Sequence, residues 1–414
     1  MNNTPRSNRT HIAVLGRRNV GKSAFMNAFL GQEMSIVSDT PGTTTDPVEK
    51  SYELQPFGPV VLIDTAGVDD EGELGEKRVE KTRKALTRAD LAVLICEVGV
   101  FSRYEAALVD DLQAARVPFV LLAGKADLAD AATLSAFVAD LDARFEQTPV
   151  LRFSATCVQD VERVKDALAR LAAAKGEDLP IVADLVHPPA TVVLVVPIDK
   201  EAPKGRLILP QVQTLRELLD ADVTTVVVKE RELEHTLRHV LREPPALVIT
   251  DSQAFLKVDA DVPPEVPLTS FSILFARHKG DLAENVRGVR AISRLKDGSR
   301  VLIAEACSHR PISEDIGRVK LPRWLASVTG AALELDVRAG HDFPADLSAY
   351  DLIIQCGGCM VNRAAILSRI RLARTQGVPI TNYGVAIAYL HGILPRAIQM
   401  FPEAMAAWRP EDGR

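Results

Sequence analysis

One eight-residue segment constrains the fold of this chain more than any other. The segment is 16–23, with the sequence GRRNVGKS, and it lies between the apolar run 12–15 and a helical pattern. A G-x-x-x-x-G-K-S/T loop between a strand and a helix predicts a phosphate-binding loop, because backbone N–H groups and the helix N-terminus converge on phosphate oxygens. Lys22 is then expected at the β- and γ-phosphates, and Ser23 is expected to bind Mg²⁺.

Two further segments, in the same order along the chain as in known nucleotide switches, predict a site that selects guanine. Asp64 follows the apolar run 60–63 and is expected in the magnesium shell, with Gly67 at the γ-phosphate. Asp127, two residues after Lys125, can accept hydrogen bonds from both N1–H and N2–H₂ of guanine. We therefore expect GTP to be preferred over ATP.

Some details of the predicted site depart from the usual GTPase pattern. Gly124 stands where the guanine motif usually has an asparagine, so lower base affinity or a less rigid loop is expected. Val68 follows Gly67, so no glutamine is available to orient the attacking water, and slow intrinsic hydrolysis is expected. Backbone N–H groups of Ser154 and Ala155 would complete the base pocket.

Residues 41–46, PGTTTD, are expected to form the first switch, with Thr44 contacting the γ-phosphate and Mg²⁺. The charged stretch 71–88 is the expected second switch. The threonine run resembles the TrmE–Era-type GTPases, in which a phosphate-loop asparagine helps to hold potassium, and Asn19 occupies the matching position. The predicted nucleotide-site residues are Gly16, Asn19, Gly21, Lys22, Ser23, Ala24, Thr44, Asp64, Gly67, Lys125, Asp127, Ser154 and Ala155. The predicted catalytic residues among them are Lys22, Thr44, Asp64 and Gly67.

Short apolar strands alternate with helical patterns along the chain, which predicts an α/β protein with parallel sheets. At 414 residues the chain is too long for one core. We expect three α/β domains, the first of them a GTP-binding domain with helices on both faces of a parallel sheet. The expected ranges are 1–175 for the GTP-binding domain, 180–265 for a small dimerisation domain and 268–414 for a cluster-binding domain.

Composition excludes several classes of protein. The net charge of −6 argues against a large nucleic-acid surface, which normally needs a basic stripe. No apolar run approaches the roughly 18 residues of a membrane span, and residues 1–9 lack the apolar core of a signal peptide. Five cysteines cannot form a disulfide framework in a chain of this length. A cytoplasmic protein is expected, with no membrane or nucleic-acid partner.

Three of the five cysteines lie in the C-terminal third of the chain. Cys307 follows the predicted strand 300–304, and Cys356 and Cys359 follow the predicted strand 351–355. Because the carboxyl ends of parallel strands meet at one edge of a sheet, we expect these thiols to converge. Three thiolates suit a [4Fe–4S] cluster with one exchangeable iron, although zinc or a dithiol redox pair is also compatible with the residues.

The spacing of these ligands behind a potassium-type GTPase domain resembles the [FeFe]-hydrogenase maturation GTPases of the HydF family. That family carries C-x-H followed by H-C-x-x-C. Cys307, His309, Cys356 and Cys359 match the pattern, whereas Gln355 stands where many relatives have histidine. Glutamine is a poor iron ligand, so the resemblance implies a fourth position filled by water, by cargo or by a displaceable side chain.

What the resemblance implies extends to ligands and partners. His309 and Glu314 are the expected displaceable ligands. The implied role is a homodimeric scaffold that receives a diiron precursor from the radical-SAM hydrogenase maturases and passes it to apo-[FeFe]-hydrogenase. The precursor is anionic, and we hypothesise that basic residues after Cys307 offset its charge. These residues are Arg310, Arg318, Lys320 and Arg323.

Two other functions remain open on the residues alone. One is an Era-type ribosome- or RNA-associated GTPase, which would need an RNA-binding appendage, yet the chain shows neither a basic stripe nor a G-x-x-G loop of the KH kind. The other is a GTP-regulated thiol oxidoreductase that uses Cys356 and Cys359.

Overall fold

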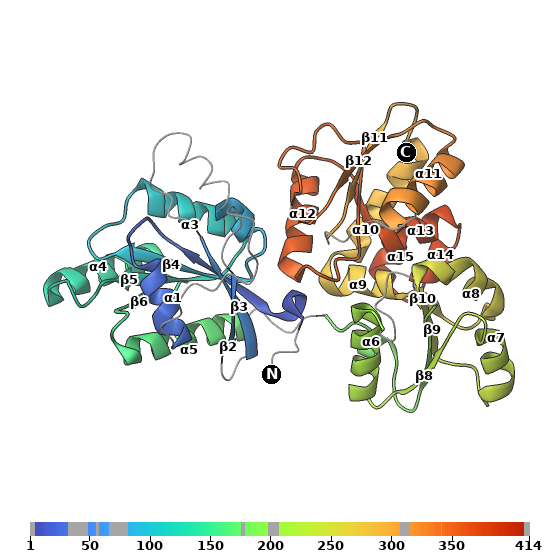
Figure 1. Cartoon of the computed structure of the whole chain (residues 1–414), viewed down its shortest axis with the longest axis horizontal. Helices are drawn as coiled ribbons and strands as arrows, with labels where there is room; N and C mark the ends of the chain where they lie inside the picture. The colour runs from blue at the N-terminus through green and yellow to red at the C-terminus, as the bar shows by residue number, and fades with distance from the viewer. Residues whose placement is uncertain are drawn as a thin grey trace. The chain divides into compact units, whose positions relative to one another are not determined.

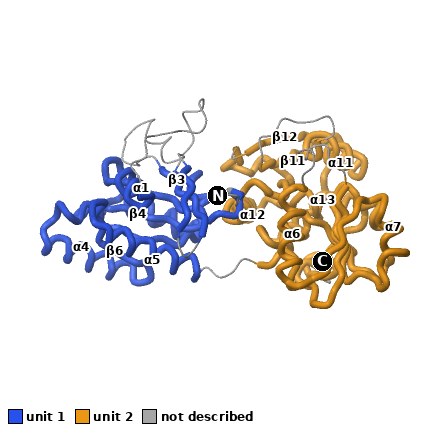
Figure 2. The backbone as a smooth tube through the Cα atoms, turned by 60° about the horizontal axis from the view of Figure 1, so that its bottom comes forward, with its two compact units in different colours: residues 1–177 blue, residues 178–414 orange. Residues whose placement is uncertain are grey.

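The computed structural model divides the chain into two compact units, residues 1–177 and 178–414 (Figure 2). The first unit corresponds to the predicted GTP-binding domain, and the second contains both of the remaining predicted domains. The residues that the structure describes are 5–31, 49–54, 58–65, 82–174, 179–197, 207–306, 315–340 and 342–409.

The first unit is built on a six-stranded sheet in the order β2-β3-β1-β4-β5-β6 (Figure 1). The strands are β1 (Thr10–Leu15), β2 (Glu49–Leu54), β3 (Gly58–Asp64), β4 (Leu91–Glu97), β5 (Phe119–Gly124) and β6 (Val150–Arg152). The helices are η1 (Arg6–Asn8), α1 (Lys22–Leu30), α3 (Arg103–Ala115), α4 (Ala131–Arg144) and α5 (Val158–Ala174). All strand pairs are parallel except β2 with β3, which is antiparallel.

Helices cover both faces of this sheet, as the alternating pattern predicts. Alternate residues of β1 enter different cores: Ile12 packs with Phe25 of α1 and Leu168 of α5, and Leu15 packs with Leu112 of α3. Such burial on both faces explains why these strands read as continuous apolar runs. The carboxyl ends of β1, β3, β4 and β5 therefore face the same edge, where the phosphate loop begins.

The second unit holds two four-stranded parallel sheets, in the orders β10-β9-β7-β8 and β12-β11-β13-β14. The strands are β7 (Thr191–Val195), β8 (Thr224–Val228), β9 (Leu247–Thr250), β10 (Leu268–Ser270), β11 (Arg300–Ala304), β12 (Glu334–Arg338), β13 (Leu352–Gln355) and β14 (Ile380–Asn382). The helices are η2 (Ala183–Leu185), α6 (Leu209–Asp220), α7 (Leu233–His235), η3 (Thr236–Val240), η4 (Ser252–Ala254), α8 (Phe255–Asp261), α9 (Phe271–Lys279), α10 (Leu282–Val289), η5 (Arg290–Arg294), η6 (Ile316–Lys320), α11 (Leu321–Thr329), α12 (Arg363–Thr375), α13 (Tyr383–Leu390), α14 (Leu394–Ile398) and α15 (Pro402–Trp408).

One hydrophobic core joins the two sheets of the second unit. It includes Val193 of β7, Leu268 of β10, Phe275 of α9 and Leu352 of β13. A second core lies between the sheet β12-β11-β13-β14 and helix α12, and it contains Ile353 of β13. The α/β fold class with parallel sheets is confirmed. None of the helices among the described residues is long and apolar enough to cross a membrane.

Candidate nucleotide and metal-cluster sites

The phosphate loop connects the end of β1 to the start of α1, where the sequence places it. Gly16 has a backbone φ of 143°, and a Cβ atom there would lie 2.6 Å from the carbonyl oxygen of Ile95. Only glycine fits this close approach. Gly21 is the residue before α1, and Asn19 has a left-handed φ of 61°. These local requirements shape the loop into a phosphate cradle.

Lys22 and Arg17 fix the loop from its two sides. Lys22 Nζ donates to the carbonyl oxygens of Gly16 (2.9 Å) and Arg17 (2.7 Å), so it lies across the loop. Arg17 Nε lies 2.6 Å from Oε1 of Glu105, a carboxylate in α3 that is fully buried. Glu105 Oε2 also accepts from the backbone N–H of Ser102 (2.8 Å). The phosphate loop is therefore tied to the start of α3 through a buried ion pair.

Glu105 was not among the residues expected at the site. A Ser-x-x-Glu pattern at 102–105 is the sequence signal for a helix-capping box, and the structure confirms the cap. Nothing in that pattern shows that the second carboxylate oxygen faces the phosphate loop.

Asp64 ends β3, beside β1 in the sheet, with Val14 as its register partner. Burial raises the pKa of Asp64, and the positive charge of Lys22 opposes that shift. The next residue, Thr65, is buried and donates its hydroxyl to the carbonyl oxygen of Val14 (2.6 Å), which holds this strand end against β1. Asp64 is thus placed near Lys22, as a magnesium-shell carboxylate requires. The expected Thr44 and Gly67 lie outside the described residues.

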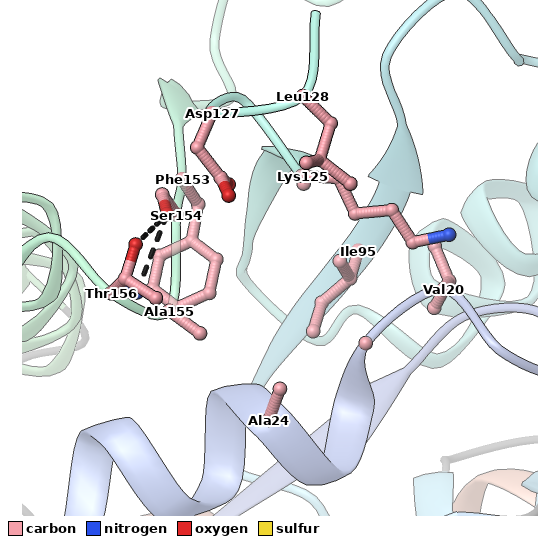
Figure 3. A pocket seen from close by; sticks show the side chains of 12 residues that line it. Val20, Ala24, Ile95, Lys125, Asp127, Leu128, Phe153, Ser154, Ala155 and Thr156 are labelled. Carbon is pink, nitrogen blue, oxygen red and sulfur yellow. Dashed lines mark hydrogen bonds between the residues drawn. The ribbon is translucent and has the colours of Figure 1, made fainter.

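A cavity of about 160 Å³ opens beside the phosphate loop (Figure 3). Its walls come from the phosphate loop, α1, β4 and the loops after β5 and β6. The lining residues are Val20, Gly21, Ala24, Ile95, Gly124, Lys125, Asp127, Leu128, Phe153, Ser154, Ala155 and Thr156. The cavity brings together the residues expected to bind the base, which come from distant parts of the sequence.

The loop after β6 is held by a buried carboxylate. Asp160, in the first turn of α5, is 1% exposed and accepts from the backbone N–H of Ser154 (3.1 Å). Arg152 Nε also donates to Asp160 (3.3 Å). Because the N–H of Ser154 is already engaged, the backbone contact expected with the base falls to Ala155. Asp160 itself was not predicted, since an aspartate in a first helical turn ordinarily reads as a surface residue.

The side chain of Ile95 explains why position 124 holds a glycine. A Cβ atom at position 124 would lie 2.8 Å from Cγ2 of Ile95 and 3.6 Å from the carbonyl oxygen of Val20. The isoleucine therefore occupies the space that a side chain at position 124 would need. The loop has other attachments: Ala126 N–H donates to the carbonyl oxygen of Phe153 (3.1 Å). This hydrogen bond attaches the loop after β5 to the residue that follows β6.

The predicted cluster site lies at the carboxyl ends of two neighbouring strands in the second unit. β11 and β13 are parallel, with Ala304 opposite Gln355. The pairing continues past the strands, because Cys356 N–H donates to the carbonyl oxygen of Ala304 (2.9 Å). Ala306 N–H in turn donates to Cys356 Sγ (3.0 Å). The residue that precedes Cys307 in the chain is therefore in contact with the first thiol of the Cys-x-x-Cys loop.

Both described thiols of this loop are partly buried. Burial raises the pKa of Cys356, and the charge of Arg369 acts in the opposite direction. Burial likewise raises the pKa of Cys359, opposed by Lys279. A dithiol exchange site usually depends on a lowered thiol pKa, so the environment of this pair disfavours that alternative. Thiolate ligands held by a metal are stable in such surroundings, because the metal replaces the proton.

Three further residues complete the expected ligand set. Cys307, His309 and Glu314 lie outside the described residues. Within the part of the chain that is described, no group of three or more His, Cys, Asp or Glu side chains is arranged to hold a metal ion. Gln355 is 1% exposed, and its Oε1 has no hydrogen-bond partner among the described residues. The two described cysteines and an unpartnered polar atom beside them fit a cluster-binding edge.

Two of the basic residues expected near the cluster, Arg318 and Lys320, have hydrogen-bond partners within this chain. Arg318 in η6 donates to both carboxylate oxygens of the buried Glu305, with its terminal nitrogen 3.1 Å from Oε2. Lys320 donates to the side-chain oxygen of Gln253. Arg318 therefore balances a carboxylate of this chain. Arg310 lies outside the described residues.

Three family models match the chain over separate ranges. The 50S ribosome-binding GTPase model matches residues 11–125. The hydrogen maturase F dimerization domain matches 181–280, and the hydrogen maturase F tetramerization domain matches 283–400. The last two together account for more than half of the chain.

Similar curated proteins match the chain in part. GTPase Der of Wolinella succinogenes is 44% identical over 22% of this chain and 19% of its own length. The tRNA modification GTPase MnmE of Chromobacterium violaceum is 34% identical over 41% of this chain and 36% of its own length. The chain thus spans well under half of the relatives it matches. Among solved structures, Aquifex aeolicus Era bound to GDP and AlF₄⁻ matches with 18% identity, a TM-score of 0.34, and coverage of 53% of this chain and 93% of that chain.

Proposed function

This chain belongs to the hydrogen maturase F family, and from that premise we propose that it is a GTP-hydrolysing scaffold for assembly of the [FeFe]-hydrogenase active site. In this proposal one unit of the chain binds and hydrolyses GTP. The other holds a [4Fe–4S] cluster and carries the diiron precursor to apo-hydrogenase.

Support for GTP binding comes from the first unit. Lys22, Ser23 and Asp64 have the positions in the chain and around β1 that phosphate and Mg²⁺ binding require. Asp127 lines the neighbouring cavity and provides the acceptor pair that guanine needs. We further propose that Asn19 helps to hold a potassium ion that supplies the positive charge that an arginine finger supplies elsewhere.

Support for cluster binding comes from the second unit. Cys356 and Cys359, with Cys307, would provide three thiolates, and His309 or Glu314 would be a displaceable ligand at the remaining iron. A cluster bound in this way would offer an open coordination site at which cargo can attach. The single observation that carries the proposal is the hydrogen bond from Ala306 N–H to Cys356 Sγ, because Ala306 is the residue before Cys307 in the chain.

Partners follow from the family and remain part of the proposal. The domains named for dimerization and tetramerization suggest that the chain forms homodimers and larger assemblies through residues 181–280 and 283–400. The radical-SAM hydrogenase maturases would load the precursor, and apo-[FeFe]-hydrogenase would receive it. GTP turnover would act on partner release or domain orientation and not on iron chemistry.

The test is anaerobic reconstitution of the purified chain with iron and sulfide, followed by metal analysis and electron paramagnetic resonance after reduction. We expect about four irons per chain and a reducible paramagnetic cluster. Potassium-dependent hydrolysis of GTP should be measured on the same sample. A colourless protein that binds zinc, or one that forms a Cys356–Cys359 disulfide without binding iron, would contradict the proposal.

A further inference from the structure

The phosphate loop rests on the connection between β4 and α3. Gly16 lies so close to β4 that a Cβ atom on it would be 2.6 Å from the carbonyl oxygen of Ile95. The next residue, Arg17, has its Nε 2.6 Å from Oε1 of Glu105, in the first turn of α3. Lys22 Nζ donates to the carbonyl oxygens of these same two loop residues. Each of the two residues that hold Lys22 is therefore in contact with one end of the β4–α3 connection.

Glu105 is fully buried, so its carboxylate needs partners within the protein. Its Oε2 accepts from the backbone N–H of Ser102 (2.8 Å) and from the hydroxyl of the same residue (2.7 Å). Its Oε1 accepts no hydrogen bond from the described residues, and the guanidinium of Arg17 beside it balances the charge. Because its two oxygens have different neighbours, the carboxylate joins the cap of α3 to the phosphate loop.

The two charges of this ion pair differ in their access to water. Glu105 is fully buried beside Cys96 of β4: burial raises the pKa of that thiol to about 12, the charge of Glu105 adds to the shift, and Arg17 opposes it. The side chain of Arg17 is 24% exposed. If the arginine turned away, the carboxylate would be left unpaired in the interior, which is strongly unfavourable. This asymmetry favours Arg17 at Glu105 over Arg17 as a phosphate ligand.

The cap of α3 does not by itself require a charge at position 105. Glutamine completes a capping box as well as glutamate does, and a neutral amide costs less to bury than a carboxylate. The phosphate-loop motif likewise leaves the residue after its first glycine unspecified. The charges of Arg17 and Glu105 are therefore best explained by their contact with each other, which links the loop to the helix.

We propose that Arg17 and Glu105 are positioning residues for nucleotide binding: their ion pair fixes the first turn of the phosphate loop and, through the carbonyl oxygen of Arg17, the position of Lys22. This inference rests on the GTP-binding part of the proposed function and is independent of the metal cluster. The N–H groups of a phosphate loop surround the α- and β-phosphates, and its lysine reaches the β-phosphate. GTP and GDP share these groups, so the ion pair acts on the affinity for both nucleotides. A direct ligand of the γ-phosphate would act on GTP alone.

The test is a double-mutant cycle in the full chain, with Arg17→Met, Glu105→Gln and the double variant. Glutamine keeps an oxygen that can accept from Ser102 N–H, so α3 keeps its cap and loses only the charge. The matched control is a second ion pair of the same unit, Arg144 with Asp140 on α4, whose side chains are 52% and 48% exposed. Fluorescent GTP and GDP analogues measure Kd, and thermal unfolding shows whether each variant is folded at the assay temperature.

We expect Glu105→Gln to raise Kd for GTP and for GDP about tenfold, the effect of one lost interaction of ordinary strength. Arg17→Met should raise both at least as much, because it also leaves the buried carboxylate unpaired beside the loop. The double variant should return to about the level of Glu105→Gln, since both substitutions break one contact. Arg144→Met, Asp140→Asn and their double variant should bind like the wild type. If Arg17→Met does not fold, equal Kd values in Glu105→Gln and the double variant are the expected result.

A rise in Kd for GTP with unchanged Kd for GDP would overturn this proposal, since Arg17 would then act as a γ-phosphate ligand. So would a double variant that binds more weakly than both single variants, because the two residues would then act independently. Unchanged Kd values in folded variants would also overturn it and leave the ion pair a role in stability alone. A wild-type chain that binds neither nucleotide would overturn the proposed GTP binding, and this proposal with it.

Discussion

The backbone N–H of Ala306 donates a 3.0 Å hydrogen bond to Sγ of Cys356, across 50 residues of sequence. The contact follows from the parallel pairing of β11 with β13, which continues beyond both strands. N–H donors to sulfur are common around cysteine-ligated clusters, where they stabilise the charge on the thiolate. Since Cys307 is the next residue, two stretches that carry the proposed ligands begin at the same edge of one sheet.

The first prediction concerns Asp160, which holds the loop of the base pocket without lining the pocket. In Asp160→Ala the buried N–H of Ser154 loses its acceptor, so the loop with Ala155 should become less ordered. We expect Kd for GTP and for GDP to rise about tenfold, which corresponds to about 1.4 kcal/mol. Binding of fluorescent nucleotides measures the change. Arg163→Ala is the control, because this exposed partner of Asp160 should have little effect; equal effects of both variants would contradict the assigned role.

The second prediction concerns the missing asparagine of the guanine motif. Gly124→Asn restores the usual residue but places a Cβ atom 2.8 Å from Cγ2 of Ile95. We expect overpacking to lower the free energy of unfolding by about 1–3 kcal/mol, with no gain in GTP affinity. Gly99→Asn is the control: the Cβ position has no atom within 4 Å, and the left-handed φ of 79° is one that asparagine tolerates better than most residues. Tighter GTP binding with unchanged stability in Gly124→Asn would show that Ile95 does not restrict this position.

The third prediction tests base selection by Asp127. Asparagine at this position replaces one acceptor by a donor, which no longer matches N2–H₂ of guanine but matches the carbonyl oxygen of xanthine. Asp127→Asn should therefore lose GTP binding and gain binding of xanthosine triphosphate, measured by competition. Asp130→Asn, at the N-cap of α4, keeps a good capping residue and should leave base preference unchanged. Retained GTP preference in Asp127→Asn would remove Asp127 from the base site.

The fourth prediction follows from the raised pKa of Asp64. Because the pKa in the folded protein is above its ordinary value, chiefly through burial, the folded state keeps the proton to a higher pH than the unfolded chain. The stability that this group contributes is therefore lost as pH rises through the raised pKa. Without nucleotide, Asp64→Asn should unfold at a higher temperature than the wild type at pH 8, and the difference should narrow as pH falls towards the ordinary aspartate range. The same variant should lose Mg²⁺-dependent GTP binding. If the wild type has the higher unfolding temperature at pH 8, burial of the Asp64 carboxylate does not lower the stability of the folded protein.

Local patterns allowed much of the fold to be predicted. The strands that became β1, β4 and β5 are buried on both faces and so read as unbroken apolar runs. β2, β10 and β12 were missed. β2 and β12 are edge strands that alternate or carry charge, and β12 begins with the exposed Glu334 and Leu335. β10 is buried but has only three residues. Such segments acquire their structure from a neighbouring strand and have little signal of their own.

The residues of the candidate site also differ in how far the sequence alone indicates them. Motif residues such as Lys22 and Asp127 could be proposed from the sequence, because phosphate and guanine require particular groups at particular spacings. Lys279 could not be predicted as a buried residue. In the sequence it is the last of three basic residues at the end of a helix, a pattern typical of a solvent-exposed lysine. Only the packing of α9 against the Cys-x-x-Cys loop buries it. Asp160 was missed for the same reason.

The most direct test of the central claim is cluster loading in Cys356→Ser, with Cys157→Ser as the matched control. Cys157 is a partly exposed cysteine of the first unit that has no part in the proposed cluster site. Both variants and the wild type are reconstituted anaerobically, and iron content, the paramagnetic signal after reduction, and GTP hydrolysis are measured in parallel. We expect the wild type and Cys157→Ser to hold a reducible [4Fe–4S] cluster, and Cys356→Ser to lose it while it still hydrolyses GTP. A wild type without iron, or a Cys356→Ser protein that loads the same cluster as the wild type, would contradict the claim that these cysteines bind a cluster.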